Sequence, residues 1–170
     1  CGIKAEALTM KHALFALTLL LTLNAQAVSL SLNDVLADLP ALDDSLPTPK
    51  EVAGVDVGER HWYHYEIVAY LDALADASPR MAALGEHART YGGRPLVSYA
   101  ISTPENIARL DEIKAARAAI IDPAAEVALA DQPAVLHMMY SIHGNEPSGA
   151  NSTPLVAYYL NAAQDEALLD

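Results

Sequence analysis

Cysteine is almost absent from this sequence, since Cys1 is the only one among 170 residues. No disulfide can form within the chain, and this excludes a small disulfide-stabilised scaffold. Aromatic residues are also scarce, at 6%, whereas hydrophobic residues make up 52%. That apolar share is typical of a foldable globular chain and argues against general disorder.

Basic residues are few as well. The chain has 10 lysines and arginines against 22 aspartates and glutamates, which gives a formal net charge of -12. The basic residues are scattered along the sequence, and binding to nucleic-acid phosphates needs a clustered basic face. The composition therefore excludes DNA and RNA as expected partners.

No apolar run reaches the roughly 20 residues that a membrane-spanning helix needs. The longest is the run at residues 13–23, which follows Lys11-His12 and precedes Ala25-Gln26-Ala27. A basic start, a short apolar stretch and an A-x-A end are the three parts of a secretory signal peptide. We expect residues 1–27 to be a cleaved signal with an upstream extension before Met10. The remaining chain would be secreted or periplasmic, with no stable membrane association.

The chain after the signal divides into two parts. Residues 28–51 are rich in Leu, Asp and Pro, and they are expected to form an acidic leader that packs loosely. About 25 residues are too few for a core of their own. Residues 52–170 form the expected folded region.

Periodicity within the folded region predicts helices and a hairpin. Apolar residues at helical spacing from Ile67 to Leu74 predict a helix that Ser78-Pro79 ends. Residues 86–91 and 95–102 flank a Gly-Gly pair and are typical of a β-hairpin. Residues 104–121 carry apolar side chains on one side and predict a second helix.

Residues 133–142 are nearly all apolar and show no alternation. Such a run favours a strand buried in a sheet that is covered on both faces. A helix is expected after residue 149, with Leu155, Val156, Tyr159 and Leu160 as its apolar side. The succession of elements predicts an α/β fold, specifically an α/β/α sandwich with a mixed sheet.

His143 and Glu146 are the candidate metal ligands, because they lie at the end of this predicted strand. Ligands in open α/β sheets bind at the carboxyl ends of strands. Imidazole nitrogen and carboxylate oxygen both bind zinc, and a catalytic zinc site commonly has three protein ligands and a water. The spacing H-x-x-E alone favours a polar loop whose glutamate caps the next helix, and the position at the strand end with the adjoining Gly144 and Pro147 makes the two interpretations equal.

The longer segment at residues 141–149, S-I-H-G-N-E-P-S-G, resembles the zinc-binding segment of the zinc metallocarboxypeptidases, the carboxypeptidase A-like peptidases. Residues 63–71, Ser78-Pro79 and the hairpin at residues 93–96 are similar to earlier parts of that family. The resemblance implies that His143 and Glu146 are the first two ligands of one Zn²⁺. It also implies hydrolysis of peptide bonds by a monomeric enzyme through a zinc-activated water.

The resemblance covers residues 58–170, about half of the family's catalytic domain. The family's third zinc ligand, its substrate-binding arginine and its general-base glutamate match no residue here. We therefore expect this sequence to be the N-terminal half of the enzyme, inactive on its own. His137, six residues before His143 on the same strand, is expected to be a core residue, and His61, His64 and His87 surface or packing residues.

Two other functions stay open. H-G-N-E also resembles the zinc segment of the aspartoacylase and succinylglutamate desuccinylase branch, whose members deacylate N-acyl amino acids. The third reading is a non-catalytic exported binding module, which the acidic composition and the incomplete set of ligands allow.

Overall fold

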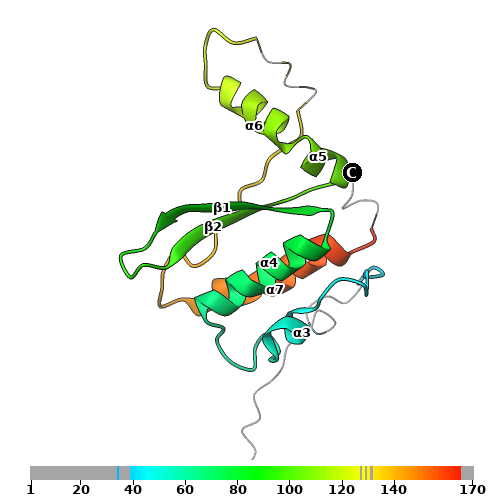
Figure 1. The fold of residues 1–170 in the computed structure, drawn as a ribbon, viewed down its shortest axis with the longest axis vertical. Helices are drawn as coiled ribbons and strands as arrows, with labels where there is room; N and C mark the ends of the chain where they lie inside the picture. Colours follow the sequence, from blue (N-terminus) through cyan, green and yellow to red (C-terminus); the bar gives the residue numbers. More distant parts are fainter. Residues whose placement is uncertain (1–33, 35–38, 127, 129, 131, 166–170) are drawn as a thin grey trace, which may run out of the picture.

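The computed structural model describes residues 34, 39–126, 128, 130 and 132–165. Two helices that run in the same direction, α4 (His64–Ala77) and α7 (Pro147–Ala162), form the central layer. The hairpin of β1 (Met81–Arg89) and β2 (Pro95–Ile101) lies on one side of them, and the short helix α3 (Pro49–Ala53) lies on the other (Figure 1). The chain is thus a mixed α/β protein with a two-stranded antiparallel sheet in its described part.

The predicted first helix and hairpin are confirmed. In α4 the residues Tyr70, Leu71 and Leu74 are buried, as their spacing indicates, and the helix ends at Ser78. The hairpin pairs Met81 with Ile101 and Arg89 with Pro95, so β1 begins earlier than residue 86. Two register irregularities fall within β1, where local twist and bending increase.

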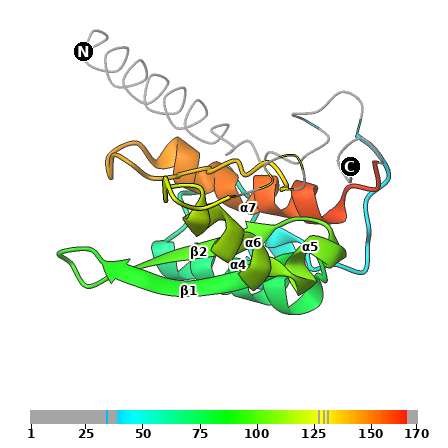
Figure 2. The same cartoon turned by 90° about the horizontal axis from the view of Figure 1, so that it is seen from above.

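The second predicted helix, residues 104–121, is divided in two. Helix α5 (Pro104–Ala108) and helix α6 (Leu110–Ala119) are separated by Arg109, whose φ of -110° and ψ of 24° are not helical. The sequence pattern of apolar residues does not reveal this break, because only Arg109 leaves the helical conformation. Helix α5 contacts β1, whereas α6 extends away from the hairpin in Figure 1 and overlaps it only in the view from above (Figure 2).

The helix after residue 146 buries a different face from the predicted one. Leu155, Val156, Tyr159 and Leu160 are only half-buried. The buried residues of α7 are Pro154, Ala157, Tyr158, Asn161 and Ala162. Helix α7 has apolar residues on two faces, and the face with the small side chains permits close approach to α4.

The second half of the expected acidic leader belongs to the core. Leu42 forms a β-bridge with Ala163, and the Asp43 amide donates to the Ala162 carbonyl at 2.7 Å. Leu46 is buried among core residues of α4 and α7. The expectation of loose packing is therefore wrong for residues 41–49. Residues 28–33 and the signal segment lie outside the described residues.

The prediction of a buried strand at residues 133–142 is wrong. Residues 133–142 form no strand, and Leu136, Met139 and Ile142 are 83%, 64% and 72% exposed. A strand needs a hydrogen-bonded neighbour, and within the described ranges β1 and β2 pair with each other and with no further strand. The segment has the composition of a buried strand without the partner strands that would bury it. His137, expected in the core, is accordingly exposed.

A buried polar cluster joins the end of α4 to the end of α7. Asn161, 3% exposed, accepts a hydrogen bond from the Ser78 hydroxyl at 2.7 Å and donates to the Ala157 carbonyl at 2.8 Å. Arg80 donates from Nη1 to the carbonyls of Asn161 at 3.1 Å and Ala163 at 3.2 Å. A cation at the C-terminal end of a helix offsets its unpaired carbonyl groups. Burial lowers the pKa of the Arg80 guanidinium.

No described helix is both long and apolar enough to cross a bilayer.

We predict that Asn161→Ala lowers the free energy of unfolding by about 2–3 kcal/mol, because it leaves the buried Ser78 hydroxyl without its acceptor. Urea unfolding followed by circular dichroism measures this. Asn145→Ala, an exposed asparagine, is the control and should change stability by less than about 0.5 kcal/mol. Equal stability of the two variants would contradict the structural role of Asn161.

Candidate functional site

The two predicted ligands lie at either end of one exposed turn. The Glu146 amide donates to the His143 carbonyl at 3.0 Å, which closes the turn directly before α7. Both side chains are exposed to solvent. The described residues around them hold no group of three His, Cys, Asp or Glu side chains that could bind a metal. The turn thus offers at most two ligands from this part of the chain.

Glu146 occupies the N-cap position of α7 but does not act as a cap. Its φ of -118° and ψ of 77° are not helical, and its side chain makes no capping hydrogen bond. Pro147 at the start of the helix has no amide hydrogen to satisfy. The alternative reading of H-x-x-E as a capping motif is not what this turn forms.

Backbone strain precedes the turn. Ser141 has a φ of 61°, and it is the one non-glycine residue with positive φ in the described part of the chain. A side chain in this conformation costs free energy, and such residues cluster at functional sites. Beside it, the Tyr140 hydroxyl is buried with no hydrogen-bond partner among the residues that the structure describes, and desolvation raises its pKa.

The other histidines in the described part of the chain complete no metal-binding group with this turn. His64 is half-buried at the start of α4, and its Nε2 is 2.9 Å from the Pro95 carbonyl, which fixes the start of β2 against α4. His61, His87 and His137 are exposed. The expected packing role fits His64, whereas His61 and His87 are surface residues as predicted.

Asn151 is a residue whose role the sequence does not indicate. Its Oδ1 accepts from the Trp62 amide at 2.9 Å, and its Nδ2 donates to the Arg60 carbonyl at 3.4 Å. Asn151 lies in the second turn of α7, five residues after Glu146. It therefore attaches the segment before α4 to the N-terminal end of α7. A contact between residues 89 positions apart has no local sequence signal.

An ion pair organises the same segment. Arg60 donates to both oxygens of Glu66, from Nη1 at 2.9 Å and from Nη2 at 2.6 Å. Glu66 also accepts from the Tyr63 amide at 2.7 Å. The Arg60 hydrogen bond, followed by the Tyr63 amide, lowers the pKa of Glu66 from 4.5 to about 2. A carboxylate in the first turn also favours the helix dipole of α4.

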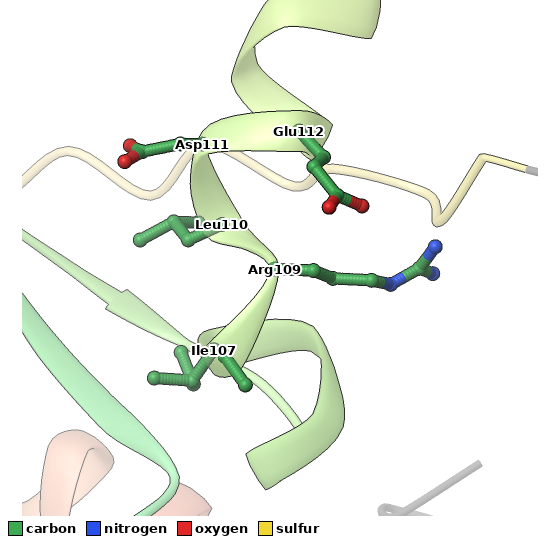
Figure 3. A pocket seen from close by; sticks show the side chains of 6 residues that line it. Ile107, Arg109, Leu110, Asp111 and Glu112 are labelled. Carbon is green, nitrogen blue, oxygen red and sulfur yellow. The ribbon is translucent and has the colours of Figure 1, made fainter.

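A shallow hollow lies where α5 meets α6, lined by residues 107–112. Its charged side chains do not converge. Asp111 points away from Arg109 and Glu112, and Ile107 and Leu110 face the side of Asp111 (Figure 3). This hollow brings no set of chemical groups together.

Comparisons with known proteins identify no relative. No protein-family model, no curated protein and no solved structure matches the chain.

We predict that Glu66→Gln removes an acid-sensitive part of the stability. The pKa is lower in the folded protein than in the unfolded chain, so the stabilisation is present above about pH 4.5 and is lost as the pH falls toward 2. Urea midpoints measured from pH 7 to pH 2 should differ most between wild type and variant at neutral pH and converge in acid. Glu59→Gln, an exposed neighbour, is the control. A constant difference across this range would contradict the prediction.

Proposed function

We propose that this chain is the N-terminal part of a zinc-dependent metallocarboxypeptidase and that His143 and Glu146 are two of its zinc ligands. The observation that carries the proposal is the exposed turn before α7, in which Glu146 takes the cap position without capping the helix. Imidazole and carboxylate are a donor pair that zinc accepts. The strained Ser141 beside the turn supports a functional role for this loop.

The donor set implies a third ligand from outside the described residues. By resemblance, that ligand is a histidine, and a glutamate and an arginine complete the site. A bound zinc would lower the pKa of its water and polarise the scissile carbonyl. Within this chain, His143 and Glu146 would hold and orient the metal, and the peptide substrate would reach them from solvent.

The proposal extends to the fold. In an α/β/α sandwich with a mixed sheet, residues 133–142 become an inner strand, and the exposed side chains of Leu136, Met139 and Ile142 are buried. The apolar character of the segment supports this arrangement, because a run of exposed apolar side chains is typical of a surface that another element covers.

We predict that His143→Ala or Glu146→Ala in the full-length protein lowers zinc affinity by at least about 100-fold, because each removes one of three ligands. Two assays measure the effect. Mass spectrometry of the dialysed protein gives its zinc content, and the rates of hydrolysis of peptides with free and with blocked C-termini give its activity. His137→Ala and His87→Ala are matched controls and should keep one zinc.

Full zinc content in both His143→Ala and Glu146→Ala would remove the site. Zinc binding with hydrolysis of N-acyl amino acids and no cleavage of peptides would replace the peptidase with a deacylase. Zinc binding with neither activity would favour an exported binding module.

We further propose export and cleavage of the signal after Ala27, on the basic, apolar and A-x-A pattern of residues 11–27. Expression of the full gene in its host and sequencing of the protein N-terminus should find Val28 first. Recovery of a protein that begins at Met10 would contradict export.

A further inference from the structure

Two tyrosines before and at the start of α4 stack on each other at the surface. The rings of Tyr63 and Tyr65 have centroids 5.6 Å apart and planes at 9°. They remain 61% and 66% exposed. A pair this exposed buries little apolar area, so the stack contributes little to the stability of the fold.

This stack depends on the backbone at the start of the helix. Residues i and i+2 do not face each other on a helix. Tyr63 is the N-cap residue and has an extended conformation, with φ of -74° and ψ of 152°, whereas Tyr65 lies in the first turn. The change in direction between the two residues brings their rings together.

Neighbouring contacts fix the position of the stack. The Arg60 guanidinium lies 5.6 Å from the centre of the Tyr63 ring and is held by the ion pair with Glu66. The Tyr63 amide is bound by Glu66, and the adjacent Trp62 amide is bound by Asn151. Exposed tyrosine and arginine side chains with little remaining freedom are the residue types that dominate recognition surfaces.

The tyrosine stack and the His143–Glu146 turn lie at the same end of the molecule. Helices α4 and α7 both begin at this end (Figure 1), and Asn151 joins the two starts. Asn151 follows Glu146 by five residues, about 7.5 Å along the helix axis. An extended peptide covers about 3.4 Å per residue, so a substrate at the turn reaches the tyrosines within a few residues.

We propose that Tyr63 and Tyr65 form a stacking subsite for an aromatic side chain of the peptide substrate, a few residues upstream of the cleaved bond. The inference rests on the proposed function. The occupant is expected to be a neutral planar group. The net negative charge of the chain disfavours an acidic side chain, and Arg60 offers no free charge to attract one because Glu66 already neutralises it.

The test uses the full-length protein and two sets of fluorescein-labelled peptides that carry Phe or Ala at the second, third or fourth position before the cleaved bond. Fluorescence anisotropy gives the dissociation constant without turnover, in zinc-free protein, and steady-state kinetics give kcat and KM in zinc-loaded protein. We expect Phe at one of the three positions to bind about 3- to 10-fold more tightly than Ala, the range of one aromatic stacking contact.

Tyr65→Ala should remove the preference for Phe and raise KM without changing kcat. Tyr65→Phe should retain the preference. Tyr91→Ala, an exposed tyrosine at the hairpin tip, is the matched control and should behave as wild type. Circular dichroism melting verifies that each variant is folded.

Equal affinity for Phe and Ala peptides, or an unchanged preference in Tyr65→Ala, overturns the subsite whether or not the protein cleaves peptides. A Phe preference that Tyr65→Ala abolishes, in a protein that binds the peptides but cleaves none, supports the subsite and refutes the peptidase function.

Discussion

The hydrogen bonds of Asn161 are the constraint on which the arrangement of this chain depends. A buried amide must find partners, and Asn161 finds them on three different elements: the Ser78 hydroxyl at the end of α4, the Ala157 carbonyl within α7, and the sulfur of Met81 at the start of β1. Because the chain turns from α4 into β1 at this point, one side chain fixes both the helix packing and the place of the hairpin.

That constraint at one end of the helix pair has a consequence at the other. Since α4 and α7 are held together at their C-terminal ends and run in the same direction, their N-terminal ends also meet. Asn151 fixes this second meeting point through the backbone at Arg60 and Trp62. The packing of the two helices, and not any local motif, therefore brings the His143–Glu146 turn and the tyrosine stack to the same end of the molecule.

The sequence predicts the parts of the fold that local forces decide. Helix α4 and the β1–β2 hairpin follow from periodicity and from Gly92-Gly93, and both are confirmed. The buried face of α7 was predicted wrongly, because large apolar residues mark one face while close packing against α4 selects the face with Ala157 and Ala162. The placement of His143 and Glu146 on one turn follows from their spacing. The link from Asn151 to Trp62 does not, because it joins distant parts of the chain.

Residues 133–142 bear on both the proposed fold and the proposed metal site. A strand of Val, Leu and Ile residues is stable only between neighbours, and its apolar side chains here are exposed for lack of them. The same segment ends at Ile142, directly before His143 begins the turn, and Ser141 near its end has a strained conformation. A pairing partner for this segment would both bury Leu136 and set the direction of the backbone that carries His143. In the proposed sandwich, completion of the sheet and completion of the proposed metal site would be one structural event, because the segment that the sheet would hold leads directly into His143.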